Sequence, residues 1–280
     1  MTDKSTALEF TGERFTPECV REIWYEHWHR YAFALDLARG KRVLDAACGE
    51  GYGSNLLAGV AGHVTGIDIS SEATSHARNR YGDRRNLEFL TGDAAQLEFP
   101  DNSFDIIVSF ETLEHLHAQE QLVAGFARVL AEDGILLISS PDKHTYSDVA
   151  GFRNEHHVRE LYREELLDLL RPHFGAVRLY GQKLLFQSVL WTLDGSGNGG
   201  VAQTVSAEGA ISSGFDYAPL YFVAVCSSKP LPAGLPSMSS FGDREESVYT
   251  HYNGEVRRNM SAGARIAELE AEIDRLRKTT

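Results

Sequence analysis

Three carboxylates follow three strand-like runs in the first half of the chain. Asp45 lies near the end of the first run, Asp68 directly follows the second, and Asp93 comes soon after the third. The carboxyl ends of parallel strands form the edge at which α/β folds bind their ligands. Three acids at that edge predict a ligand that carries positive charge and hydroxyl groups.

The glycine-rich segment VLDAACGEGYG, residues 43–53, narrows the choice of ligand. A dinucleotide would bring a diphosphate, which favours bare backbone N–H groups at a helix N-terminus. Here Asp45 and Glu50 would face that diphosphate, and the loop reads G-x-G-x-G, not the G-x-G-x-x-G of dinucleotide sites. S-adenosylmethionine (SAM) instead brings an ammonium and a sulfonium, which suit an acidic strand end. We therefore expect SAM, with Asp68 accepting from the ribose hydroxyls and Asp93 placed near the adenine amine.

Alternating strand-like and helix-like runs must position these acids. Repeats at this spacing predict a parallel sheet with helices on both faces. The expected strands are 42–47, 63–67, 87–91, 104–110, 134–140, 176–183 and 220–226, and the expected helices are 20–38, 52–58, 71–81, 122–129 and 163–170. We divide the chain into a leader helix region (1–40), a catalytic domain (41–228) with a flexible insertion at about 190–216, a Pro/Ser-rich linker (229–261) and an amphipathic heptad helix (262–280).

Composition excludes several classes of protein. The 280 residues include 27 Lys+Arg and 40 Asp+Glu, giving a net charge of −13. Such an acidic chain is not expected to bind nucleic acid or an anionic membrane over a broad face. Three scattered cysteines predict neither a disulfide framework nor a zinc site. With no signal-peptide pattern and no apolar run that could span a bilayer, we expect a cytoplasmic protein, held at the inner face of the membrane only through partners.

The stretch 43–141 resembles a class I SAM-dependent methyltransferase. It carries the family's glycine motif, the ribose-binding acid in GIDIS, the adenine-proximal acid in TGDAAQLEF, and FDIIVSFETLEHL after the fourth strand. The resemblance covers about residues 20–228 and implies a Rossmann-like seven-stranded sheet of order 3-2-1-4-5-7-6, with the last strand antiparallel. It further implies the cofactor-binding residues Asp45, Gly49, Gly51, Asp68, Ile69, Asp93, Ala94 and Phe110, of which Asp45 would reach the SAM amino group through water.

A second cluster is expected to serve the methyl acceptor. Glu111, Glu114 and His115 fall on one face of a helical turn if the segment is helical, and His157 follows in NEHHVREL. Carboxylates and imidazoles of this kind can ligate Mg²⁺ or Mn²⁺. The pattern resembles methyltransferases that chelate a vicinal diol through a divalent metal. Without a metal, His157 or His115, assisted by Glu114, would act as the base that removes the hydroxyl proton.

The leader, with FTGER and later HRY before the glycine motif, resembles bacterial methyltransferases of surface-polysaccharide (O-antigen, lipopolysaccharide) assembly. That resemblance places Arg14, His29, Arg30 and Tyr31 at the acceptor pocket or over SAM. Ordinary packing of the aromatic residues and solvation of the others would explain the same residues equally well.

The final stretch has a heptad pattern. Ile266, Leu269, Ile273 and Leu276 are spaced 3, 4, 3, and the flanking charges would match across a parallel dimer. This predicts self-association or recruitment of partner glycosyltransferases, with an amphipathic helix on the domain surface as the alternative.

We therefore expect an O-methyltransferase that modifies a glycan or sugar. The alternatives are methylation of a small catechol or quinone precursor, and a SAM-binding scaffold that recruits glycosyltransferases through its tail. A nicotinamide-dependent oxidoreductase is the least favoured reading, because of the acids in the glycine loop.

Overall fold

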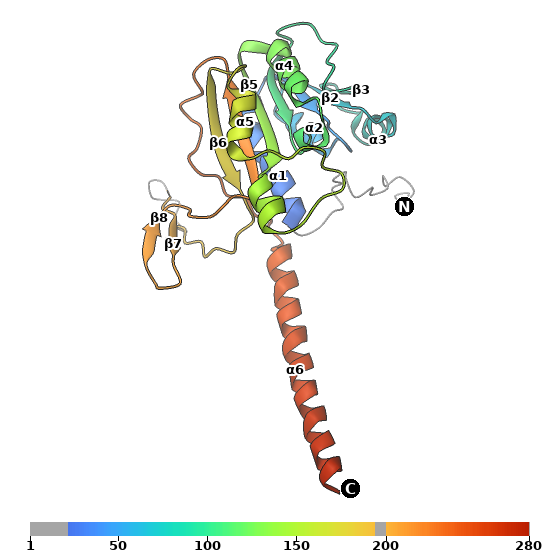
Figure 1. Cartoon of the computed structure of the whole chain (residues 1–280). Helices are drawn as coiled ribbons and strands as arrows, with labels where there is room; N and C mark the ends of the chain where they lie inside the picture. The colour runs from blue at the N-terminus through green and yellow to red at the C-terminus, as the bar shows by residue number, and fades with distance from the viewer. Residues whose placement is uncertain (1–21, 194–199, 280) are drawn as a thin grey trace.

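The computed structural model describes residues 22–193 and 200–279, and its centre is one seven-stranded sheet (Figure 1). The strands of this sheet are β1 (Arg42–Ala46), β2 (His63–Asp68), β3 (Leu87–Thr91), β4 (Phe104–Ser109), β5 (Leu130–Pro141), β6 (Ala176–Gln182) and β9 (Tyr221–Ser227). The helices are α1 (Glu22–Ala38), α2 (Tyr52–Leu57), α3 (Ser71–Tyr81), α4 (Gln119–Val129), α5 (Arg163–Leu170) and α6 (Ser247–Thr279), with short turns η1 (Leu113–His115) and η2 (His144–Val149).

The strand order is β3-β2-β1-β4-β5-β9-β6. Strands β1 to β5 pair in parallel, and β9 runs antiparallel between β5 and β6. The seventh strand of the sheet is thus the antiparallel one, and the predicted Rossmann-like fold is confirmed. Because six strands, β1 to β6, point the same way and only β9 runs against them, the carboxyl ends of those six strands meet at one edge.

Alternate residues of each strand face opposite sides of the sheet and build two apolar cores. On one side Val43 and its neighbours pack against α1, α2 and α3. On the other side Leu44 and its neighbours pack against α4 and α5. Helices α2 and α3 each contact the strand that precedes them and the strand that follows them, as parallel crossover connections require.

Two predicted segments differ from the structure. The insertion expected to be flexible contains a small hairpin, β7 (Gln203–Val205) with β8 (Ile211–Ser213), whose turn at Gly209 has a φ of 84°. The glycines at 195–199 lie outside the described residues. The last helix begins at Ser247, not at 262, because Asp243 accepts hydrogen bonds from the Ser247 backbone and hydroxyl and so caps its start.

Helix α6 leaves the domain as a single rod (Figure 1). Among the described helices none combines the length and the apolar character that crossing a bilayer requires.

Candidate functional site

The glycine loop between β1 and α2 turns sharply at the edge of the sheet. Ala47, Gly49 and Gly51 all have positive φ, at 60°, 54° and 91°. A Cβ on Gly51 would stand 2.8 Å from both Ala77 and Phe89, so only glycine fits between the loop and α3. The turn brings bare backbone close to the strand ends, which is what a bound SAM would need.

Asp68 ends β2 beside this loop. Its carboxylate accepts hydrogen bonds from the backbone N–H of Gly49 and of Ser70, each at 2.9 Å, and so ties the two strand ends together. The next side chain, Ile69, is apolar and 75% exposed. A carboxylate with an exposed apolar neighbour fits a ribose and its base, and the contacts predicted for Asp68 and Ile69 stay predictions.

Asp93 occupies the corresponding place after β3. Its side chain accepts from the Ala95 backbone at 2.8 Å, and Ala94 beside it is buried. The carboxylate is partly exposed at the same edge as Asp68. The predicted adenine contact by Asp93 stays a prediction that this placement allows.

Asp45 lies beneath the loop and is fully buried. Its carboxylate accepts from the Ser54 hydroxyl at 2.6 Å and from the Tyr31 hydroxyl at 3.1 Å. Burial raises its pKa from the ordinary value of 3.8 to about 6, against the lowering effect of those two hydrogen bonds. The carboxylate thus faces two hydroxyl groups, and the predicted contact with the SAM amine through water remains untested.

The side chain of Glu50 points away from the expected ligand. We expected it to face the ligand, but its buried carboxylate is taken up by α3, where it meets His76 Nε2 at 3.0 Å, Arg80 Nη1 at 2.7 Å and the Tyr81 hydroxyl at 3.0 Å. The physical reason is that Gly51 turns the chain, so the preceding side chain points across the loop to α3. Glu50 locks the loop to α3.

Two adjacent residues of α1 connect the cofactor loop with the acceptor side. The Tyr31 ring meets Phe110, at the end of β4, edge to face with centroids 5.1 Å apart, and its hydroxyl reaches Asp45. Arg30 turns toward Glu111, whose Oε1 lies 3.4 Å from Nη2. Tyr31 therefore contacts Asp45 and Phe110, while Arg30 contacts Glu111, and the predicted role of both residues at the acceptor stays a prediction.

Arg30 is a nearly fully buried cation. Its Nε donates to Gln182 Oε1 at 2.8 Å, and its guanidinium stacks 4.6 Å from the centre of the Tyr221 ring. Nη1 has no hydrogen-bond partner among the described residues. Glu111, with a φ of 50°, is fixed by Ser139, whose hydroxyl accepts from the Glu111 backbone and donates to its carboxylate.

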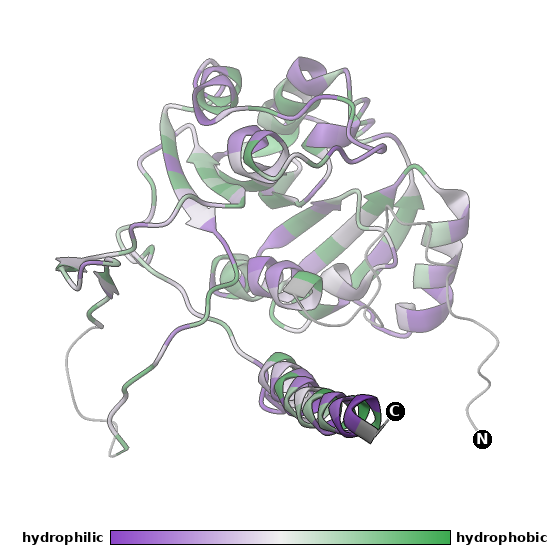
Figure 2. Cartoon of the chain, turned by 60° about the horizontal axis from the view of Figure 1, so that its bottom comes forward, coloured by the Kyte–Doolittle hydropathy of each residue, from purple (hydrophilic) through white to green (hydrophobic). Residues whose placement is uncertain are grey.

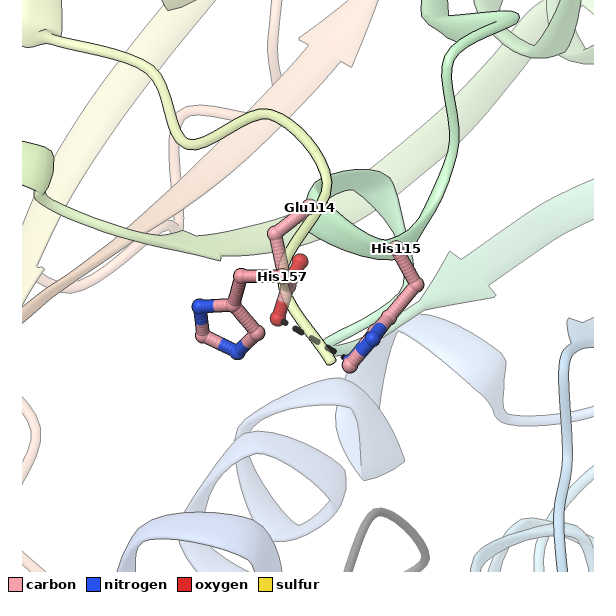
Figure 3. A group of neighbouring side chains, drawn as sticks. All are labelled: Glu114, His115 and His157. Carbon is pink, nitrogen blue, oxygen red and sulfur yellow. Dashed lines mark ion pairs between the residues drawn. The ribbon is translucent and has the colours of Figure 1, made fainter. Parts of the chain in front are cut away.

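Glu114, His115 and His157 converge at the same edge (Figure 3), with one potential ligand atom from each lying within 4.8 Å of the others. Glu114 is 1% exposed, and neither of its carboxylate oxygens has a hydrogen-bond partner among the described residues. Burial and the nearby Glu111 raise its pKa well above the usual range. The prediction that Glu111 shares one helical face with this group is wrong, because its positive φ takes it out of the η1 turn and toward Ser139.

The loop that carries His157 is fastened to η1. The Glu114 carbonyl accepts from the backbone of Val158 at 2.8 Å and of Arg159 at 3.0 Å. The Nδ1 of His115 lies 3.0 Å from the His156 carbonyl, so it carries the proton and leaves Nε2 as the basic atom. This bonding brings residues 42 positions apart into one cluster without any helix spanning them.

Sequence reasoning missed two residues that hold His157. Its Nδ1 donates to Glu160 Oε1 at 2.5 Å, and its Nε2 accepts from the Asn154 amide at 3.0 Å. Glu160 is itself held by the Ser147 hydroxyl and is 9% exposed. The i, i+3 spacing of a histidine and a glutamate was the available signal.

His29 does not join the acceptor side. It is a neighbour of Arg30 on α1, but successive helical residues point about 100° apart, and His29 instead contacts Ser239 and stacks on Phe241 at 5.5 Å. Arg14 lies outside the described residues.

Comparison with known proteins agrees with this geometry. Residues 44–138 match a family described as a methyltransferase domain. The chain is 38% identical over 168 residues to a probable S-adenosylmethionine-dependent methyltransferase of Mycolicibacterium smegmatis, covering 59% of this chain and 64% of that protein. It is 37% identical over 172 residues to one of Mycobacterium tuberculosis, covering 60% and 62%. The chain thus spans less than two thirds of the length of these relatives.

Among solved structures, the YcgJ protein of Bacillus subtilis superposes with a TM-score of 0.53 at 20% identity, covering 73% of this chain and all of that one, which supports the fold. The names of these relatives state no acceptor, so the resemblance to polysaccharide methyltransferases gains no support from them. Residues 44–138 thus match a methyltransferase domain, and the glycine loop and the strand-end acids Asp45, Asp68 and Asp93 lie within the matched residues.

Proposed function

We propose that the chain transfers a methyl group from SAM to a hydroxyl of a glycan or sugar. The observation that carries this proposal is the buried carboxylate of Glu114, which accepts no hydrogen bond from the described residues and lies 3.9 Å from His115 Nε2, at the edge where the cofactor loop lies. Leaving a buried charge without a partner costs several kcal/mol or forces a proton onto it. A bound ligand that supplies positive charge or donor hydroxyls would relieve that cost.

The cofactor half fits SAM. In this proposal Asp68 would accept from both ribose hydroxyls, Ile69 would pack on the base, and the backbone at Gly49 and Gly51 would approach the methionine part, which the hydrogen bond between Asp68 and Gly49 and the exposure of Ile69 support. SAM supplies the electrophilic methyl group. Phe110 and Tyr31 close the site between the two halves and exclude water from the transfer.

Glu114, His115 and His157 fit a divalent metal such as Mg²⁺ or Mn²⁺, since they offer one carboxylate and two imidazole nitrogens. Such an ion would lower the pKa of the acceptor hydroxyl. Without it, the acceptor hydroxyl would replace the Asn154 amide as the group that donates to His157 Nε2, and this nitrogen would then remove the proton. Glu160 would hold the ring by its Nδ1–H and stabilise the charge that forms. Either way, Glu160 is a positioning residue for His157.

A sugar suits the walls of this side of the site. The ring of Tyr146 stacks on His157 at 5.3 Å and lies 5.9 Å from the ring of Tyr221, and Arg30 and Glu111 stand nearby. Aromatic faces accept the C–H faces of a sugar, and charged groups bind its hydroxyls. A small catechol could use the same aromatic walls and remains the second candidate.

The test is to incubate the whole chain with SAM and with each of two panels of acceptors. The first panel contains oligosaccharides and sugar nucleotides, and the second contains catechols. Mass spectrometry then detects the addition of one methyl group. We expect mass gain with a member of the first panel. A gain restricted to catechols, or none in either panel, would refute the glycan proposal.

Residue roles are tested on the acceptor so found. His157→Ala should lower kcat about 100-fold or more, and Glu160→Gln about tenfold with a changed pH profile. Glu132→Gln, a surface residue paired with Lys229, is the matched control. If EDTA abolishes turnover and Mg²⁺ or Mn²⁺ restores it, a metal is used; if EDTA has no effect, Glu114 and the two histidines lose the ligand role.

A further inference from the structure

Helix α6 carries an apolar stripe whose side chains are about half exposed to solvent. Ile266, Leu269, Ile273 and Leu276 are between 46% and 60% exposed. The helix stands away from the sheet and its covering helices (Figure 1), and green and purple residues alternate around it (Figure 2). Its contact with the rest of the chain is near its start, where Tyr252 meets Phe186 with centroids 5.4 Å apart.

The residue types in the stripe favour one kind of coiled coil. In the heptad notation abcdefg, Ile266 and Ile273 take position a, and Leu269 and Leu276 take position d. β-Branched residues at a with Leu at d favour two parallel strands over three or four. One heptad earlier, position a holds Asn259 and position d holds Ala262. An Asn at a single a position fixes the register of a parallel pair.

The charges beside the stripe fit a second copy of the same helix. Position g holds Arg265 and Glu272, and the following e positions hold Glu270 and Arg277. In a parallel pair in register, each g residue faces the e residue five positions later on its partner. Arg265 then faces Glu270, and Glu272 faces Arg277, so every such pair in residues 265–277 is of opposite charge.

We infer that α6 forms a parallel two-stranded coiled coil with α6 of a second copy of this chain, over residues 259–279. The inference does not depend on the acceptor or on the methyl transfer. Burying the a and d side chains against one another removes apolar surface from water, which a lone projecting helix of this length does not achieve.

The mass of the whole chain in solution, measured by light scattering during size-exclusion chromatography at micromolar concentration, tests the association. We expect the mass of two chains. Ile273→Asp, at a, should raise the dissociation constant at least about 100-fold and give a monomer. Ala271→Asp, at the outward position f, is the matched control and should stay dimeric. A monomeric parent chain, or an Ile273→Asp protein that remains dimeric, would overturn the inference.

Charge exchange tests the pairing. Arg265→Glu should raise the dissociation constant about tenfold, and Arg265→Glu with Glu270→Arg should restore it, since each dimer contains two copies of this charge pair. Arg275→Glu, at position c beside Glu272, changes the same charge without facing the partner and is the control. Failure of the double variant to recover would count against this register.

Cross-linking tests the orientation. A cysteine introduced by Leu276→Cys would face its own copy in a parallel pair, so mild oxidation should give a covalent dimer. Ala271→Cys, on the outside, should not. If Leu276→Cys yields no covalent dimer while the parent chain is dimeric, the helices are not parallel and the inference fails.

Discussion

The cofactor half and the acceptor half of the site differ in how their buried charges are satisfied. Asp45, Asp68 and Glu50 all accept hydrogen bonds from side chains or backbone of the loop and its neighbours. Glu114 and Arg30 are equally buried, yet the Glu114 carboxylate and the Nη1 of Arg30 have no hydrogen-bond partner among the described residues. The first half is assembled before any ligand arrives. The second carries an electrostatic cost that a ligand would relieve.

The largest expected effect comes from breaking the assembled half. Asp68→Ala removes the carboxylate that accepts hydrogen bonds from the Gly49 and Ser70 backbones and that would bind the ribose. Hydrogen bonds to a charged carboxylate are stronger than those between neutral groups, so their loss should be large. We expect the dissociation constant for SAM, measured by isothermal titration, to rise at least about 100-fold. Glu88→Gln, on β3 away from the loop, should bind SAM as the parent does. Unchanged affinity in Asp68→Ala would remove the cofactor assignment.

The next largest effect is expected from Glu114→Gln, which should raise the stability of the fold and lower the rate of methyl transfer. Glu114→Gln replaces a buried carboxyl group that accepts no hydrogen bond from the described residues with a neutral isostere, so we expect the free energy of unfolding at neutral pH to rise by about 1–3 kcal/mol. Methyl transfer should fall strongly at the same time. Denaturant melts and turnover of one preparation measure both. A Glu114→Gln protein that is less stable would show that the carboxylate is satisfied in the folded chain.

Asp45 contributes a smaller, pH-dependent effect. Its folded pKa of about 6 lies above the ordinary 3.8, so the folded chain keeps the proton over a range where the unfolded chain has lost it. Stability from this group is therefore present at low pH and lost as the pH rises through 6. Relative to Asp45→Asn, the parent should lose about 1 kcal/mol between pH 5 and 7 in urea melts. A constant difference between the two proteins would contradict the raised pKa.

The smallest effect is relief of backbone strain. Ala47 has a φ of 60°, a conformation that costs a residue with a Cβ about 1 kcal/mol. Ala47→Gly should therefore gain stability of up to about 1 kcal/mol, less the extra entropy of glycine in the unfolded chain. Gly51→Ala should lose stability in the same assay, because its Cβ would collide with Ala77 and Phe89. Equal losses in both variants would show that the positive φ at Ala47 carries no strain.

The parallel sheet and its strand order could be predicted because the hydrophobic pattern of each segment agrees with the topology of the whole domain. Alternation of short apolar strands with helical stretches permits little besides a parallel sheet, and the acids at the strand ends follow from it. The heptads of the last helix were visible too, yet its start at Ser247 was not. That start depends on the cap by Asp243, in a segment that reads as a linker by composition.

The site was predictable in its residue types but not in its connections. That Glu114, His115 and His157 meet depends on backbone hydrogen bonds between η1 and residues 158–159, which no local pattern encodes. The directions taken by Glu50, Glu111 and His29 depend on a turn at Gly51, a positive φ and a helical phase respectively.

The sequence by itself predicted the cofactor class, because the order of the glycine loop and the strand-end acids is a property of residue types along the chain. The tertiary structure alone decided which buried acids accept hydrogen bonds and which do not, because a buried charge acquires its partners from segments such as α1, α3 and residues 154–160 that are distant in sequence.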